Sequence, residues 1–477
     1  MQQDYLIYGG VASFCIILGK RGIRVSTIAA IATGNSVGGI GVIRISGEQA
    51  IQIADRVFQP MDKSSLCKLK GYRAKYGNVI INNTPSDNGV ALVFRAPRSY
   101  TGEDVVEISV HGGLLTVQKT LQAVLDAGAV AAQAGEFTKR AFLNGKMDLT
   151  QAESVAQLIS AQGEAAMKAS FNAMQGSLSN KINGVLQILL DTSAVMSAWV
   201  DYPDEEIPEL EENDLMSSLK KCQSELEALL KSYDNGQTII GGVDTVIAGM
   251  PNVGKSSLMN MLVGRDKSIV THIAGTTRDI VEESVRLGNI VLHLRDTAGL
   301  RQSDDVVESI GIDKAYKALD DAQLVLAVFD NARELCERDF DLIERCKGKN
   351  AVAVINKNDL EQRLDIERIQ NSFASVVCIS AQNGEGLSEL ENAVEQMLGV
   401  SDFDTNAPML ANSRQRQNCQ NALECIKQAI DGLSLGVTYD ALNVMIDSAC
   451  DELLSLTGKK ATSEVVNNIF SKFCVGK

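Results

Sequence analysis

One glycine-rich run, GMPNVGKS at residues 249–256, constrains the fold of this chain more than any other feature. Residues 243–248, rich in β-branched side chains, precede it and the helix-forming residues 257–263 follow it, so the order is strand, loop, helix. The glycines let backbone N–H groups curve around phosphate oxygens, while Lys255 supplies a positive charge and Ser256 a hydroxyl that can ligate magnesium. This order predicts a parallel α/β domain of the Ras-like P-loop class.

Three further motifs follow in the order that a GTP-binding domain requires. DTAG at 296–299 offers a magnesium-linked carboxylate and a glycine that can sense the γ-phosphate. NKND at 356–359 offers an aspartate, and such a carboxylate accepts both N–H groups of guanine, which adenine cannot supply. SAQ at 380–382 is expected to close over the base. The motifs therefore predict GTP rather than ATP as the ligand. Each follows a strand-like run, at 290–294, 351–355 and 376–379.

The segment THIAGTTRD at 271–279 lies between the phosphate loop and the DTAG motif. It is short, polar and glycine-containing, so it can order around the γ-phosphate and relax after hydrolysis. Thr277 is the candidate that completes magnesium coordination beside Ser256. The predicted nucleotide contacts are Asn252, Val253, Gly254, Lys255, Ser256, Ser257, Thr271, His272, Ile273, Ala274, Gly275, Thr276, Thr277, Asp296, Thr297, Ala298, Gly299, Asn356, Lys357, Asn358, Asp359, Ser380, Ala381 and Gln382.

Hydrolysis requires a group that orients water and a positive charge in the transition state. Small GTPases commonly place a glutamine just after the glycine of the Asp-x-x-Gly turn, but this chain has Leu300 there, which cannot polarise water. Asn252, together with backbone carbonyls from 271–276, is placed to hold a monovalent cation where an arginine would otherwise insert. For the water, the residues alone leave three carboxylates open: Asp304, Asp305 and Glu308.

The sequence pattern that indicates strands or helices changes along the chain. Residues 27–144 alternate short strand-like runs with turns and contain one helix-like stretch at 114–127, which predicts an α+β domain. Residues 145–241 and 400–477 have a helical period, and the α/β block 242–399 stands between them. We therefore expect one discontinuous helical domain with a P-loop domain inserted into it. The strand-like runs of the first block are residues 40–45, 79–81, 90–94 and 105–110.

Two interruptions stand out in this pattern. Pro203 and Pro208 break the first helical block into at least two long helices. Residues 5–18 are apolar, but they are too short for a membrane span, and the basic residues follow them instead of preceding them as in a signal peptide. We expect residues 1–26 to be a non-native or unstructured extension, with translation starting near Val25.

Charge and cysteine usage exclude some classes of protein. A net charge of −15 over 477 residues argues against a dedicated binder of polyanions, because phosphate contacts need clustered Lys and Arg. An acidic chain can still act on nucleic acid if a partner supplies the basic surface. The ten cysteines show neither a C-x-x-C pair nor a metal-binding spacing with histidine, so we expect reduced, mostly buried thiols in the cytoplasm and no membrane span.

Taken with their flanks, these features resemble the MnmE (TrmE) family of tRNA-modification GTPases, among the TrmE-Era-EngA-like P-loop GTPases. The resemblance covers nearly all of residues 27–477 and is more specific than the GTPase motifs, which many families share. It rests on GIGVIRISG at 39–47, YTGED at 100–104, HGG at 111–113, GEFTKRAF at 135–142, NGKMDL at 144–149 and FCVGK at 473–477.

The resemblance implies a function that composition does not reveal. The family acts with a flavoprotein partner, MnmG (GidA), in a heterotetramer. Together they add an aminomethyl or carboxymethylaminomethyl group at C5 of the wobble uridine (position 34) of certain tRNAs. The family's N-terminal domain, here residues 27–144, forms the homodimer and binds 5-formyl- or 5,10-methylene-tetrahydrofolate. The resemblance also implies activation of the GTPase by potassium.

Site residues follow by matching motifs. The folate contacts implied are Arg44, Glu107, Lys146 and Lys477. The potassium ligands implied are Asn252, Thr271, Ile273 and Thr276. Glu308 is implied as the acid that orients water, and Cys474, in the Cys-x-Gly-Lys tail beside the folate, as a residue with a possible chemical or structural role.

Two other classes of function compete with this one. A ribosome-assembly or translation-associated GTPase would use GTP as a timer and its flanks to bind rRNA, but the flanks here are acidic. A folate enzyme with a regulatory GTPase insert would keep its wobble-modifying activity after deletion of the insert.

Overall fold

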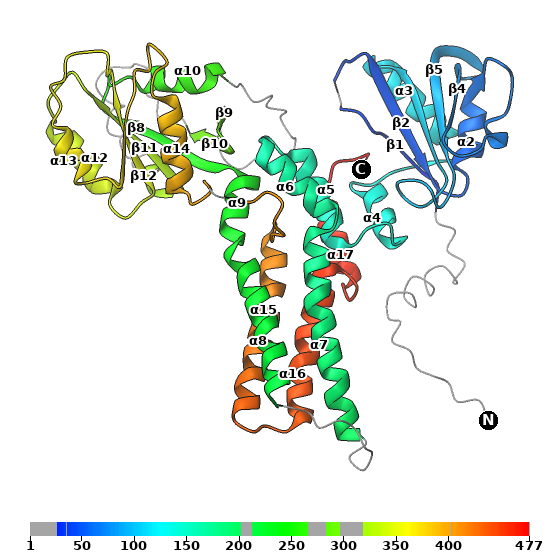
Figure 1. The fold of residues 1–477 in the computed structure, drawn as a ribbon. Coiled ribbons are helices and arrows are strands. Elements are labelled where there is room, and N and C mark those ends of the chain that lie inside the picture. Colours follow the sequence, from blue (N-terminus) through cyan, green and yellow to red (C-terminus); the bar gives the residue numbers. More distant parts are fainter. Residues whose placement is uncertain are drawn as a thin grey trace. The chain divides into compact units, whose positions relative to one another are not determined.

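A computed structural model describes residues 26–34, 36–201, 212–265, 283–295, 318–401 and 403–476. The chain divides into two compact units, whose helices and strands are labelled in Figure 1. The first contains the chain up to residue 156 together with 179–223 and 417–477, and the second contains 157–178 and 224–416. The chain therefore passes from one unit to the other four times.

A seven-stranded sheet forms the N-terminal part of the first unit, in the order β3-β4-β5-β6-β2-β1-β7. Neighbouring strands are antiparallel except β1 and β7, which are parallel. Helices α2 (Ala50–Val57) and α3 (Leu114–Asp126) pack on this sheet. The strands are β1 Ile28–Ile31, β2 Ile40–Ser46, β3 Phe58–Pro60, β4 Arg73–Ile81, β5 Thr84–Phe94, β6 Val105–His111 and β7 Val130–Ala131. The α+β prediction is confirmed.

Alternation along β2 divides the two faces of this sheet. Ile43 and Ile45 are fully buried and join Ile108 of β6 in the core beneath α2 and α3. Because successive side chains of a strand point to opposite faces, Arg44 lies on the other face. The antiparallel register places it directly opposite Glu107 of β6. Opposite charges in such a pair attract one another.

The helical elements of the first unit follow the sheet in sequence. Pro203 and Pro208, which are predicted to break the first helical block, lie outside the described residues, between α7 and α8 in sequence. α7 is tied to α16 by two side-chain hydrogen bonds, from Ser193 to Asp447 at 3.1 Å and from Asn443 to Ser197 at 2.7 Å. Besides α2 and α3, the α-helices that lie wholly or partly in this unit are α4 Glu136–Leu143, α5 Leu149–Ser160, α7 Ser177–Asp201, α8 Glu212–Lys231, α15 Ser413–Ser434, α16 Tyr439–Thr457 and α17 Ser463–Ser471.

The second unit is a doubly wound α/β domain with a six-stranded sheet in the order β13-β12-β11-β8-β10-β9. All neighbouring pairs are parallel except β10 and β9. This confirms the Ras-like class. Its strands are β8 Val243–Gly249, β9 Glu283–Leu287, β10 Ile290–Arg295, β11 Leu324–Asp330, β12 Ala351–Asn356 and β13 Ser375–Cys378. Its helices are α6 Glu164–Met174, α9 Tyr233–Gly241, α10 Lys255–Arg265, α12 Glu337–Cys346, α13 Ile366–Gln370 and α14 Leu387–Met397.

The central strands of this sheet are apolar on both faces. Every residue of β11 and of β12 is buried, which is typical of parallel strands covered by helices on both sides. Parallel strands bring their carboxyl ends to the same edge, and that edge of a doubly wound sheet is where ligands bind. Gly249, Asp330 and Asn356, which end β8, β11 and β12, share this edge.

Candidate functional site

The phosphate loop joins the carboxyl end of β8 to the start of α10. Gly254 has a φ of 96°, and a Cβ there would lie 2.1 Å from Nδ2 of Asn356, so only glycine fits. Lys255 begins α10, and its ammonium donates to the carbonyls of Gly249 and Met250, each at 2.8 Å. Burial lowers the pKa of Lys255. A phosphate in the loop would offer this ammonium a charged acceptor, which makes a stronger hydrogen bond than a carbonyl.

Asn356 connects the phosphate loop by hydrogen bonds to the segments predicted to bind the base. Its Nδ2 donates to the carbonyl of Val253 at 2.9 Å, and its Oδ1 accepts from the backbone N–H of Ala381 at 3.0 Å. Asn356 is 2% exposed, so both bonds are shielded from water. Close by, the hydroxyl of Ser380 donates to Oδ1 of Asp359 at 2.6 Å and orients that carboxylate. Three of the four predicted motifs therefore meet at one edge of the sheet.

Lys357 makes a second connection across the same edge. Its ammonium donates to the backbone carbonyl of Asn252 at 2.8 Å and lies 2.6 Å from Oδ2 of Asp330. The sequence analysis did not single out Asp330, which belongs to none of the motifs. The signal that could have found it is a continuous apolar run, 324–329, ending in a carboxylate where a parallel strand ends.

The described residues include only part of the predicted nucleotide site. Ser256 and Ser257 lie in the first turn of α10. The N–H of Asn358 donates to the carbonyl of Ile379 at 3.0 Å, which joins the NKND and SAQ segments. The other predicted contacts lie outside the described residues: Thr271, His272, Ile273, Ala274, Gly275, Thr276, Thr277, Asp296, Thr297, Ala298, Gly299 and Glu308, together with Asp304 and Asp305.

A second group of predicted site residues gathers in the N-terminal domain around Arg44. Its Nε donates to Oε1 of Glu107 at 2.8 Å, and Nη1 donates to the carbonyl of Gly476 at 3.1 Å. The guanidinium also lies 5.7 Å from the ring centre of Tyr100 and 5.6 Å from that of Phe137. Aromatic rings at such distances attract a cation through their π faces. Five segments from across the chain therefore contribute to one cluster.

Lys146 and Cys474 are the other described residues of the predicted folate site. The ammonium of Lys146 donates to the carbonyl of Pro97 at 3.2 Å. Cys474 is exposed, and its carbonyl accepts from the N–H of Gly135 at 3.3 Å. Lys477 lies outside the described residues. The set combines one carboxylate with several cations, and a folate carries a pterin ring with donor and acceptor edges and a negatively charged glutamate tail.

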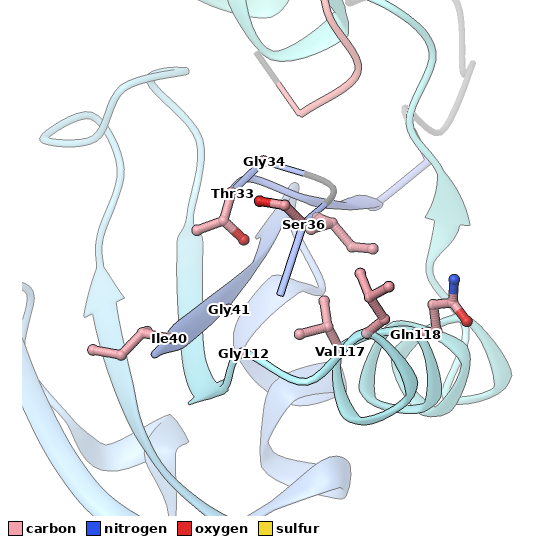
Figure 2. Close-up of a pocket in the computed structure, with 10 residues that line it drawn as sticks. Thr33, Gly34, Ser36, Ile40, Gly41, Gly112, Val117 and Gln118 are labelled. Carbon is pink, nitrogen blue, oxygen red and sulfur yellow. The ribbon is translucent and has the colours of Figure 1, made fainter. Parts of the chain in front are cut away.

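Figure 2 shows a small pocket in the same domain, between the segment that joins β1 to β2 and the start of α3. Gly41 faces it, and a Cβ at that position would meet Cγ2 of Val117 at 2.2 Å. Arg44, Glu107 and Lys146 do not line this pocket. Its polar lining consists of Thr33, Ser36 and Gln118. The predicted folate cluster is thus a different feature of the domain.

Across the ranges that the structure describes, every helix is too short or too polar to cross a membrane. The described cysteines are all unpaired thiols. Four of these nine are buried, fewer than the sequence analysis expected.

Comparisons with known proteins now identify the family. A family model described as the MnmE helical domain matches residues 149–474, and one described as the GTP-binding protein TrmE N-terminus matches residues 27–146. The G domain of the T. maritima FeoB iron transporter covers 32% of this chain and 98% of its own length at 30% identity, with a TM-score of 0.25.

Curated relatives match over nearly the whole chain. The tRNA modification GTPase MnmE of Clostridioides difficile (strain 630) is 38% identical over 454 residues, which is 94% of this chain and 99% of that protein. The MnmE of Listeria innocua is 41% identical over 455 residues with the same two coverages. The nucleotide loops, the cluster around Arg44 and these matches lead to one conclusion: the chain belongs to the MnmE family of tRNA-modification GTPases.

Proposed function

We propose that this GTPase couples GTP hydrolysis to the addition of an aminomethyl or carboxymethylaminomethyl group at C5 of the wobble uridine of certain tRNAs. It acts in the cytoplasm as a homodimer, in a heterotetramer with the flavoprotein MnmG (GidA). The observation that carries the proposal is the pair of bonds from Asn356 to the phosphate loop and to Ala381, at 2.9 and 3.0 Å, in a chain of this family. These bonds hold together, at one edge of the sheet, segments far apart in sequence that carry the predicted guanine-nucleotide contacts.

The wobble nucleosides themselves test this proposal. Deleting the gene should remove the modified wobble uridines from total tRNA, as measured by mass spectrometry of nucleoside digests. Complementation with the intact chain restores them, and complementation with Lys255→Ala does not. Unchanged wobble uridines together with accumulation of immature ribosomal particles would favour the ribosome-assembly alternative instead.

In the nucleotide site, residues of the four motifs and of 271–277 contact GTP, and Ser256 and Thr277 hold magnesium. A potassium ion binds to Asn252, Thr271, Ile273 and Thr276 and supplies the positive charge that an arginine supplies elsewhere. Support comes from Asn252, whose backbone carbonyl is fixed by Lys357 while the residue remains exposed in the phosphate loop. Glu308 orients the attacking water.

Steady-state GTP turnover in matched potassium and sodium salts tests the cation site. Potassium should raise the rate on the order of tenfold or more, because it neutralises charge that develops in the transition state. Asn252→Ala should reduce the potassium rate to the sodium rate. Glu308→Ala should keep nucleotide affinity and lose hydrolysis in either salt. Equal rates of the unaltered protein in both salts would remove the potassium proposal but leave the nucleotide site intact.

In the N-terminal domain, Arg44, Glu107, Lys146 and Lys477 hold a tetrahydrofolate, with Cys474 beside it. When bound, this cofactor supplies the one-carbon unit. Glu107 accepts from the pterin ring, and the cations bind the glutamate tail. The fit rests on Glu107, which is 25% exposed and already oriented by Arg44, so it is open to a ligand on its solvent side.

Calorimetric titration of 5-formyl-tetrahydrofolate tests the folate site independently of GTP. Arg44→Met should weaken binding about tenfold, the effect of losing one charge-assisted hydrogen bond. Arg95→Met is a matched control, because Arg95 pairs with Asp104 in the same domain at 3.4 Å and is not among the predicted folate contacts. Equal affinities of Arg44→Met and the unaltered protein would disprove the assignment.

A further inference from the structure

Asp330 ends β11 at the edge of the sheet where the nucleotide motifs meet. Its side chain is 11% exposed, and its two carboxylate oxygens have different partners. Oδ2 lies 2.6 Å from the ammonium of Lys357, and Oδ1 accepts from the N–H of Ala332 at 2.9 Å. One oxygen therefore shapes the turn that follows β11, and the other reaches a residue of the NKND motif.

Lys357 passes this contact on to the phosphate loop, since its ammonium also donates to the carbonyl of Asn252 at 2.8 Å. Asn252 and Lys357 both have left-handed backbones, with φ of 66° and 65°. Asparagine adopts this conformation more readily than most residues, but a lysine keeps it only where its surroundings hold it. The ammonium lies between one carbonyl and one carboxylate, so Asp330 supplies the only full negative charge that the structure gives it in the described residues.

We propose that Asp330 is a positioning residue for the binding of guanine nucleotides. Its charge fixes the ammonium of Lys357, and the ammonium fixes the backbone of the phosphate loop at Asn252. The loop that binds phosphates and the loop that binds the base thereby keep one spacing before the ligand arrives, and such preorganisation strengthens binding. The inference rests on the proposed nucleotide contacts of Asn252 and Lys357.

The position of Asp330 also determines which kinetic constant it controls. It bonds to Lys357 and to a backbone N–H, so it acts on the nucleotide only through the loops. An interaction of this kind stabilises the ground state and the transition state of hydrolysis equally, and its loss raises KM without lowering kcat. Asp330→Asn should therefore raise KM for GTP about tenfold and leave kcat within about twofold.

A double-mutant cycle separates positioning from a structural role. Asp330→Asn keeps an oxygen that can accept from Ala332 but removes the charge. The dissociation constant of a fluorescent GDP analogue should rise about tenfold in Asp330→Asn, yet less than about twofold when the same change is made in Lys357→Met, because the two residues act as a unit. Equal rises in both backgrounds would show that Asp330 acts independently of Lys357 and would overturn the proposal, as would no rise in either.

Asp320→Asn is a matched control. Asp320 also pairs with a lysine, Lys349, at 3.1 Å, but that lysine precedes β12 at the opposite end of the strand. This variant should bind the GDP analogue like the unaltered protein. If Asp330→Asn does not fold, Asp330→Glu is judged in the same cycle, because it keeps the charge but displaces it. Failure of the unaltered protein to bind GDP would refute the proposed function, whereas normal binding with an additive cycle refutes only the role of Asp330.

Discussion

Asn252 and Lys357 have backbone conformations that favour glycine, although each carries a polar side chain. A left-handed conformation at a non-glycine residue costs about 1–3 kcal/mol. The direct bond between these two residues, with the carboxylate of Asp330 behind it, offsets that cost. Strain of this kind at a ligand site keeps the site in its binding-competent shape at the expense of stability.

The neighbouring carboxylate of Asp359 is the group that we propose to select the base. Ser380, which is 1% exposed, orients Asp359 through a 2.6 Å hydrogen bond. Asp359→Asn replaces an acceptor oxygen by a donor amide, so the variant should favour xanthosine over guanosine nucleotides by at least about tenfold in relative affinity. Competition binding with GDP and xanthosine diphosphate measures the ratio. Ser380→Ala should weaken both nucleotides and keep the preference for guanine; an unchanged ratio in Asp359→Asn would contradict the role of this carboxylate.

Sequence reasoning located the motif residues but not their bonds. The glycine of the phosphate loop and the NKND motif follow from fixed spacing, because phosphates and guanine demand those groups. Asp330 was not predicted as a site residue, because a single aspartate at the end of an apolar run does not form a motif of fixed spacing. The hydrogen bond from Arg44 to the carbonyl of Gly476, 432 positions away, was not predicted either. Every residue has a backbone carbonyl, so the residue type does not indicate which carbonyl accepts.

At the scale of elements, strands with an alternating or continuous apolar pattern were found close to their true bounds. The predicted run 105–110 lies within β6, and 351–355 lies within β12. The strands β4 and β5 are longer than the predicted runs 79–81 and 90–94. The prediction missed the remaining residues of these strands, many of which are exposed. Exposed strand residues are polar and resemble a loop in sequence. Tertiary pairing, not local propensity, makes them strands.

The start of α12 carries a prediction of its own. Asp339 is fully buried, and its carboxylate accepts from the N–H of Cys336 at 3.0 Å, which is part of a capping box at the start of the helix. The same carboxylate pairs with Arg333 at 2.6 Å. Burial acts to raise the pKa of Asp339, but the bonds from Arg333 and Cys336 outweigh it and hold the pKa below the ordinary 3.8. Asp339→Asn should lower the free energy of unfolding by about 2 kcal/mol at pH 7.

The pH dependence of that difference follows from the sign of the shift. A carboxyl whose pKa is lowered in the folded state stabilises the fold above its unfolded pKa, about 3.9, and loses this contribution as the pH falls through the folded value. The gap between Asp339→Asn and the unaltered protein should therefore be full at pH 7 and shrink below about pH 4. Urea unfolding at a series of pH values measures it, with Glu344→Gln, from the exposed pair with Lys347, as control. A gap that stays constant down to pH 3 would rule out the ionised form as its source.

At the scale of the whole molecule, the unit that contains the nucleotide site extends beyond the predicted block 242–399. The carbonyl of Ala411 accepts from Gln157 at 3.2 Å and from Gln237 at 2.7 Å, and its N–H donates to Gln415 at 2.8 Å. These bonds join α5, α9 and the start of α15 within that unit. Sequence texture could not place this boundary, because glutamines on helices are as common on solvated faces as at such junctions.

Cysteine reactivity reports on the integrity of both units. Burial raises the pKa of Cys222 and Cys346 to about 11 and of Cys419 and Cys450 to about 12. At pH 8 these thiols should resist iodoacetamide until denaturant is added, whereas the exposed thiol of Cys474 should be alkylated at once. Peptide mass spectrometry after timed quenching measures each rate. Rapid labelling of Cys222 in the native protein would show that the packing of its helix is wrong.

The bond from Arg44 to Gly476 also has a consequence for biosynthesis. The two residues are 432 positions apart, so at about 5–20 residues per second the ribosome adds the second roughly 20–90 s after the first. The N-terminal sheet can form early in that interval, but Arg44 cannot bond to Gly476 until the end of the chain has been synthesised. A prematurely terminated polypeptide would carry a folded first domain in which the cluster around Arg44 lacks Gly476. Such a product would therefore not have the complete cluster of the full-length enzyme.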